Sequence, residues 1–155
     1  MVFHRLLRVS PNGVTPEQTA LAVLLCKRTQ DAPIHPGHWG LFGGTRKESE
    51  SAEEAANREV REELKVCQGL DLVATGRRLT ELTEVPVSRP TGTVVIRYFS
   101  CAFDYDLDKL TLLPNDEGKV EGEGLGWFTE EEVCRLLVRP EDLIAVRSFF
   151  KTTRA

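Results

Sequence analysis

Long apolar runs are missing from this sequence of 155 residues. No segment reaches the roughly 18 consecutive apolar residues that a membrane-spanning helix needs. Residues 1–5 are not followed by an apolar stretch with a small-residue cleavage site, so nothing resembles a secretory signal. These absences exclude a membrane-spanning protein, and we expect no membrane partner.

Paired cysteines and an excess of basic residues are missing as well. The cysteines Cys26, Cys67, Cys101 and Cys134 are dispersed, which argues against a zinc-finger or thioredoxin-type pair and indicates a reducing, cytoplasmic location. The formal charge of −4 argues against a nucleic-acid partner held by a broad basic surface. Small phosphorylated ligands remain compatible with it, because a bound divalent cation reverses the local sign of charge.

The pattern of apolar residues and turn residues predicts one mixed α/β domain over residues 1–155. The predicted strands are 2–9, 20–26, 93–103 and one or two within 70–85. The predicted helices are 51–66, 129–137 and 140–151. Ser51 and Thr129 each precede a glutamate by three residues, which is typical of a capping box at the start of a helix. Residues 29–40 and 114–124 have the composition of loops.

The helix predicted over 51–66 carries three carboxylates on one side. At about 100° per residue, Glu59, Glu62 and Glu63 fall within one arc of the helix. Their repulsion, roughly 0.2–0.5 kcal/mol per exposed pair, would be relieved by nearby arginines or by a hard cation. Ligands that are all oxygen suit Mg²⁺ or Mn²⁺ and, with them, phosphate chemistry. By themselves, however, the glutamates favour the ordinary alternative of a solvated acidic face.

The spacing around these glutamates resembles the Nudix box. That pattern is Gly, five residues, Glu, seven residues, Arg-Glu, an apolar residue, any residue, Glu-Glu, any residue, Gly and an apolar residue. Here the matching positions are Gly44, Glu50, Arg58-Glu59 and Glu62-Glu63, with Lys65 in place of the late glycine. We expect this lysine either to cost about 1 kcal/mol in a left-handed conformation or to shift the end of the helix.

The resemblance implies an α/β/α sandwich with a mixed central sheet and a Nudix hydrolase that cleaves a phosphoanhydride bond. It also implies Mg²⁺ as cofactor, with Mn²⁺ as a possible substitute. The implied metal ligands are Glu59, Glu62, Glu63 and the carbonyl of Gly43. Arg58 would orient a carboxylate of the box through a bidentate pair.

A further acid is expected ahead of a late strand that carries a tryptophan, as in many Nudix proteins. Glu121 lies six residues before Trp127, and Glu123 is the second candidate. Such an acid ligates a second metal ion or acts as general base towards the attacking water. The candidate catalytic residues are therefore Glu62, Arg58, Glu121 and Glu123.

Three residues outside the box are candidates for substrate contacts. Trp39 could stack on a base or a sugar, although packing is the favoured interpretation. Arg97 and Arg78 could reach a phosphate or a terminal sugar, although solvent exposure is the default for a strand arginine. The signatures of relatives that cleave ADP-ribose, dinucleoside polyphosphates or NADH are absent downstream of the box. A nucleoside diphosphate sugar is thus favoured slightly over a nucleoside triphosphate.

Two other functions remain open from the sequence. A Nudix-fold module could sense a nucleotide without cleaving it, although retention of all three box glutamates favours catalysis. The chain could also remove pyrophosphate from RNA 5′ ends, against which its acidic balance argues. A homodimer is frequent among relatives, and no residue decides this point.

Overall fold

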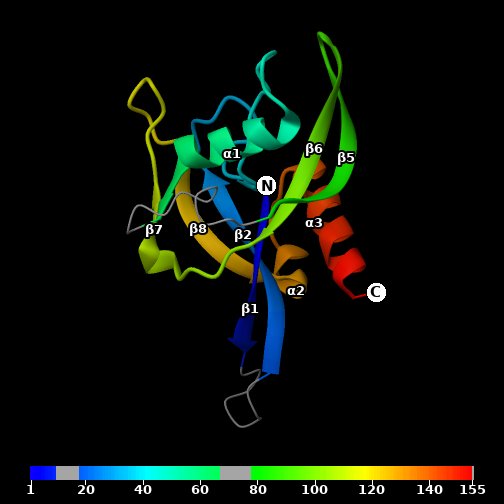
Figure 1. Ribbon diagram of the computed structural model, residues 1–155. Coiled ribbons are helices and arrows are strands. Elements are labelled where there is room, and N and C mark those ends of the chain that lie inside the picture. Colours follow the sequence, from blue (N-terminus) through cyan, green and yellow to red (C-terminus); the bar gives the residue numbers. More distant parts are fainter. Residues whose placement is uncertain (10–17, 67–77, 155) are drawn as a thin grey trace.

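The computed structural model describes residues 1–9, 18–66 and 78–154 (Figure 1). In chain order the elements are β1 (Val2–Val9), β2 (Gln18–Arg28), β3 (Trp39–Gly40), α1 (Ala52–Glu63), β4 (Leu64–Val66), β5 (Thr80–Arg89), β6 (Gly92–Ala102), the 3-10 helix η1 (Leu107–Lys109), β7 (Leu110–Leu112), β8 (Gly122–Thr129), α2 (Glu130–Val133) and α3 (Pro140–Thr153). Six strands form a sheet of order β3-β2-β1-β6-β5, with β8 also paired to β2. Because β1 and β6 are parallel and the other neighbours antiparallel, the sheet is mixed.

Alternating side chains of the central strands divide the core into two layers. Ala22 and Leu24 of β2 belong to a buried cluster that includes Val60 of α1. Val23 and Leu25, which point to the opposite face because strand side chains alternate, belong to a second cluster with helix α3. Helix α1 therefore covers one face of the sheet and α3 the other, and the predicted α/β/α sandwich is confirmed (Figure 1).

The predicted end of the first helix is wrong by three residues. The helix ends at Glu63, and Leu64 has an extended backbone with φ −133°. Leu64 and Val66 are buried while Lys65 is exposed, which is the alternation of a strand, and β4 pairs with β7. Of the two outcomes expected for Lys65, the shifted helix end is the one observed. Its side chain therefore stands in a strand and needs no left-handed conformation.

The other predicted elements are largely confirmed. The strands expected over 2–9, 20–26 and 93–103 correspond to β1, β2 and β6, and Pro140 starts α3 as predicted. The second helix was predicted through residue 137 but ends at Val133. Two loops are shorter than predicted, since Trp39–Gly40 is a short strand and β8 begins at Gly122. Within 70–85, strand β5 begins at Thr80, and residues 67–77 lie outside the described residues.

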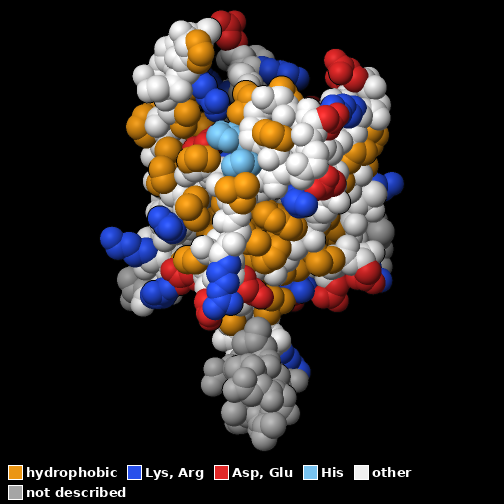
Figure 2. All heavy atoms as spheres, turned by 180° about the vertical axis from the view of Figure 1, so that it is seen from behind, with side chains coloured by type: hydrophobic (Ala, Val, Ile, Leu, Met, Phe, Trp, Pro, Cys, Tyr) orange, Lys and Arg blue, Asp and Glu red, His pale blue; other side chains and the backbone are white. Residues whose placement is uncertain are grey.

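The surface carries charged side chains of both signs. On the face seen from behind, Lys and Arg side chains are interspersed with Asp and Glu around exposed apolar side chains (Figure 2). Within the described ranges, we find no helix that is long and apolar enough to cross a membrane.

Candidate active site

A complete capping box fixes the start of helix α1. The Ser51 hydroxyl accepts a hydrogen bond from the Glu54 amide at 3.2 Å, and the Glu54 carboxylate accepts one from the Ser51 amide at 2.7 Å. Such caps stabilise a helix by about 1 kcal/mol. The helix that begins here has 12 residues, and the three box glutamates lie in its last five.

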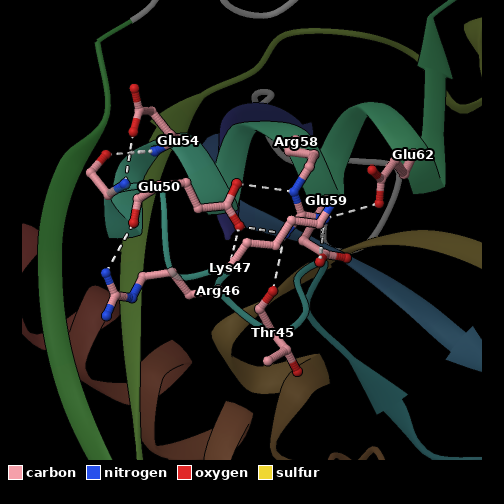
Figure 3. Close-up of polar contacts among 9 residues, drawn as sticks. Thr45, Arg46, Lys47, Glu50, Glu54, Arg58, Glu59 and Glu62 are labelled. Carbon is pink, nitrogen blue, oxygen red and sulfur yellow. Dashed lines mark hydrogen bonds and ion pairs between the residues drawn. The ribbon is translucent and has the colours of Figure 1, made fainter.

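Arg58 binds Glu50 in a bidentate ion pair across the loop that precedes the helix (Figure 3). Its Nε and Nη2 atoms lie 3.1 and 2.7 Å from the two carboxylate oxygens. The Glu50 carboxylate also accepts a hydrogen bond from the Lys47 amide at 2.7 Å. The Arg58 hydrogen bonds, together with that amide, lower the pKa of Glu50 to about 2. Glu50 is therefore ionised at any physiological pH and holds the loop against the helix.

The same guanidinium also contacts two of the predicted metal ligands. Its Nη1 atom donates to Glu59 at 2.7 Å and to Glu62 at 3.1 Å (Figure 3). The side chain of Glu59 is 16% exposed and that of Glu62 is 55% exposed. Arg58 thus neutralises part of the repulsion between these carboxylates and orients both towards the same side of the helix.

Glu63, the third box glutamate, is held from the glycine pair. Its Oε2 atom accepts a hydrogen bond from the Gly43 amide at 3.1 Å. Burial raises the pKa of Glu63 to about 7, a rise that the Gly43 hydrogen bond opposes and that the charges of Glu59 and Glu121 increase. A carboxyl group with this pKa gains from a cation beside it, because the cation favours the ionised form.

Gly44 lies so close to the Glu59 carboxyl that a side chain at this position would displace the carboxyl group. A Cβ atom built on Gly44 would clash with all three atoms of that carboxyl group. Glycine at this position therefore leaves the Glu59 carboxyl in its place beside the backbone. The neighbouring Gly43 has φ +148°, a conformation that side-chain-bearing residues rarely adopt.

Four of the five predicted acids line one pocket, which we call the carboxylate pocket, with a volume of about 450 Å³. It is bordered by acids from the box and from the loop before β8, namely Glu59, Glu62, Glu63 and Glu121. Gly43 and Gly44 form part of its wall. Glu121 accepts a hydrogen bond from the Asn115 amide group at 3.3 Å. Segments far apart in the sequence thus bring four acids to one site.

The chemistry of these residues suits a hard divalent cation. The donors are oxygens, Glu63 is an acid whose ionisation is disfavoured by burial, and Gly44 leaves room for the Glu59 carboxyl. Among residues 1–9, 18–66 and 78–154, no three acidic, histidine or cysteine side chains already surround one point. Ion binding would therefore need side-chain rotation, which the exposed Glu62 can make at low cost.

The remaining predicted residues lie elsewhere. Glu123 pairs with Lys27 at 2.7 Å and lies outside the carboxylate pocket. Trp39 packs edge-to-face on Phe128 with ring centroids 4.8 Å apart, which agrees with its favoured packing role. Arg97 pairs with Glu84 at 2.6 Å, and Arg78 is an exposed residue just ahead of β5.

The sequence did not indicate that three arginine side chains line the carboxylate pocket. Arg28, Arg61 and Arg139 line it together with the acids. Arg28 ends the buried strand β2, and its Nε donates to the Ile34 carbonyl at 3.0 Å. The one signal that the sequence offered for Arg28 is its place in the basic pair Lys27-Arg28 after the apolar run 20–26, because strand ends open towards loops.

A model of the NUDIX domain matches residues 8–149. Over 43 residues the chain is 51% identical to the nucleoside triphosphatase NudI of Enterobacter sp. (strain 638), a stretch that covers 28% of this chain and 30% of that protein. A mutT/nudix family protein from Listeria innocua shares the fold with a TM-score of 0.68 and 21% identity, over 99% of this chain and 90% of that one. The NUDIX domain of Shewanella oneidensis NrtR, solved with ADP ribose, has a TM-score of 0.62 and 20% identity over 86% of this chain and 79% of that one.

Proposed function

This chain belongs to the NUDIX family, and we propose that it is a Mg²⁺-dependent hydrolase of a phosphoanhydride bond in a nucleoside diphosphate derivative. The observation that carries this proposal is the convergence of Glu59, Glu62, Glu63 and Glu121 on one pocket beside a glycine pair. Nucleoside diphosphate sugars are the favoured substrates. A small nucleotide is accordingly the expected partner, and a cytoplasmic location and a homodimer stay predictions from the sequence.

The three box glutamates would hold Mg²⁺, with the Gly43 carbonyl as a further ligand. Mn²⁺ would substitute because it takes the same oxygen ligands. When bound, the cation neutralises charge on the phosphate oxygens and so lowers the barrier to attack by water. Arg58 contacts Glu59 and Glu62 and keeps both on one side of the helix, where they would be available to the cation.

Glu121 is proposed as the general base. It lines the carboxylate pocket but comes from the loop before β8, so it approaches the substrate from a different direction than the helix does. A carboxylate can accept the proton of the attacking water from there while the box glutamates act as ligands. Arg28, held by the Ile34 carbonyl, would pair with a phosphate oxygen of the substrate.

A second groove supports a substrate that is bulky on both sides of its diphosphate. This hairpin groove, with a volume of about 880 Å³, is lined by the alanine face of α1, the β5–β6 hairpin and the start of α3. Leu41, Phe42, Gly43 and Gly44 border both the groove and the carboxylate pocket. A diphosphate over the glycine pair would then send one moiety into each space. Arg97 lines the groove, where it could reach sugar hydroxyls.

Nucleoside triphosphates are the second candidate. The observation that favours them is the 51% identity over 43 residues with a nucleoside triphosphatase. For RNA 5′ ends, the formal charge of −4 offers no comparable support, and the face in Figure 2 carries charges of both signs.

The test is a hydrolysis screen with Mg²⁺ over nucleoside diphosphate sugars, nucleoside triphosphates and dinucleotides, with products identified by mass spectrometry. We expect nucleotide sugars to give a nucleoside monophosphate and a sugar phosphate. Arg97→Gln should lower kcat/KM for nucleotide sugars more than for triphosphates, and Arg147→Gln on the exposed face of α3 should change neither. Tight nucleotide binding without turnover would instead indicate a sensor. Release of pyrophosphate from triphosphates alone would favour the second candidate.

A further inference from the structure

A fully buried carboxylate lies at the start of helix α3, behind the glycine pair. Asp142 is 0% exposed. Its Oδ2 accepts hydrogen bonds from the Leu41 amide at 2.8 Å and from Arg139 Nε at 2.7 Å. Its Oδ1 accepts one from the Tyr98 hydroxyl at 2.8 Å. The two oxygens thus have separate partners: Oδ2 binds the segment before the glycine pair and the N-cap residue of α3, and Oδ1 binds Tyr98 of the sheet.

An ionised carboxylate is costly to bury unless it is paired and hydrogen-bonded. Asp142 meets this condition through the Arg139 guanidinium and two further donors. It also lies in the first turn of α3, where the helix dipole favours a negative charge. Each partner helps to offset the free-energy cost of burying the carboxylate. Removal of any one partner therefore disturbs the whole network.

The segment that contains Leu41 is attached to the start of α3 at several points. The Trp39 amide donates to the Leu137 carbonyl at 2.8 Å, and the Arg139 amide donates to the Trp39 carbonyl at 2.9 Å. Gly40 passes so close that a Cβ atom there would lie 2.9 Å from Asp142 Oδ2 and 3.0 Å from Arg139 Nε. These contacts end at Leu41, two residues before Gly43.

Gly43 links this segment to the candidate metal site, because its amide donates a hydrogen bond to the Glu63 carboxylate at 3.1 Å. Two residues span at most about 7 Å, so a shift of Leu41 has little chain in which to dissipate before Gly43. We propose that Asp142 is a positioning residue: it fixes the segment Leu41–Gly43 and thereby the direction in which Glu63 faces the carboxylate pocket. This inference rests on the proposed function, since it assigns Glu63 to a bound cation.

A purely structural role for Asp142 would stabilise the fold without affecting the metal site. The two arms of the carboxylate separate these roles. Tyr98→Phe removes the bond on Oδ1 and leaves the Leu41 bond in place, whereas Asp142→Ala removes both. Gly40→Ala acts from the other side, because its methyl group crowds Asp142 Oδ2 and Arg139 Nε and pushes the segment away from them, while both charged side chains remain present.

The experiment measures Mn²⁺ binding by electron paramagnetic resonance, kcat and KM, and hydrogen–deuterium exchange of the Gly43 amide in the metal-free full chain. We expect Asp142→Ala and Gly40→Ala to weaken Mn²⁺ binding by about tenfold or more, the usual effect of removing a partner of a metal ligand. Both variants should also lower kcat more than they raise KM, and both should speed the exchange of the Gly43 amide. Tyr98→Phe should lower the unfolding midpoint yet keep Mn²⁺ affinity within about twofold. Asp142→Asn, which retains an acceptor for Leu41, should recover affinity relative to Asp142→Ala.

Two outcomes overturn the inference. The first is that Gly40→Ala and Asp142→Ala both fold and both keep the wild-type Mn²⁺ affinity, kcat and exchange rate of the Gly43 amide. The other is an equal loss of Mn²⁺ affinity in Tyr98→Phe, which would make the effect one of general stability. If Asp142→Ala does not fold, Gly40→Ala carries the test. A wild-type chain that binds no Mn²⁺ contradicts the proposed function, and Gly43 exchange still decides whether Asp142 fixes the segment.

Discussion

Arg58 and Glu50 form a two-pronged ion pair that ties the loop before α1 to the middle of the helix, with N–O distances of 3.1 and 2.7 Å. The remaining nitrogen of the guanidinium contacts Glu59 and Glu62. The Arg58 side chain therefore connects Glu50, in the loop between the glycine pair and α1, with two candidate metal ligands. A planar group with fixed donors is needed for this geometry.

Arg58→Lys should lower hydrolysis by about 10–100-fold while the chain stays folded, because an ammonium group cannot make all of these contacts at once. The pKa of Glu50, now about 2, should rise towards its ordinary value. Carboxyl carbon NMR titration measures the second effect. Arg135→Lys, which alters an exposed pair with Glu131, is the control and should change neither quantity. An unchanged rate in Arg58→Lys would remove the assigned role.

Glu62→Gln should reduce hydrolysis about 100-fold or more, because metal-ion stabilisation of the transition state is worth several kcal/mol. Its side chain is 55% exposed, so the free energy of unfolding should change by no more than about 0.5 kcal/mol. Steady-state kinetics with Mg²⁺ and urea denaturation measure the two quantities. Glu53→Gln, an exposed glutamate in the first turn of the same helix, should match the wild type. Activity that survives both Glu62→Gln and chelation would contradict a metal-dependent reaction.

Stability without metal should depend on pH through Glu63. Burial raises its pKa from 4.5 to about 7, so the folded chain prefers the protonated carboxyl. The stability from this protonation is fully present below the unfolded pKa and is lost as the pH rises through about 7. Glu63→Gln cannot ionise, and it should therefore raise the free energy of unfolding above pH 7 and have little effect below 4.5.

Urea denaturation in a chelating buffer, at several pH values, measures this difference between Glu63→Gln and the wild type. Added Mg²⁺ should stabilise the wild type at high pH and leave Glu63→Gln nearly unchanged, since the cation favours ionised Glu63. A difference that is constant across the pH range would show that burial does not control the ionisation of this group.

Gly44→Ala should displace the Glu59 carboxyl and weaken metal binding, because the new methyl group would overlap that carboxyl. We expect hydrolysis to fall by about tenfold or more. Gly124→Ala is a matched control, since a Cβ atom there would lie 4.0 Å from Lys27 Cβ, an ordinary contact. Mn²⁺ titration together with circular dichroism separates a loss of binding from a loss of folding. Equal behaviour of the two variants would argue against the required close approach.

Much of the candidate site could be predicted because it is local in the chain. The glutamates lie within one helix, and helical periodicity alone puts Glu59, Glu62 and Glu63 on one side. The spacing of Gly44 and Glu50 to Arg58-Glu59 and Glu62-Glu63 carried the family resemblance. The helix end was not predictable in the same way. Leu64 and Val66 leave the helix because burial against β7 outweighs a weak local preference for helix.

The sequence by itself determined the family, the buried strand within the apolar run 20–26, and the helix that carries the acids, because these depend on local composition, periodicity and short spacing. Only the tertiary structure decided that Glu121 lines the carboxylate pocket while Glu123 pairs with Lys27. It also decided that Asp142 meets Leu41, 101 residues away in the chain. Such contacts depend on how strands and helices pack in three dimensions, and no local pattern of residues encodes which distant side chains that packing brings together.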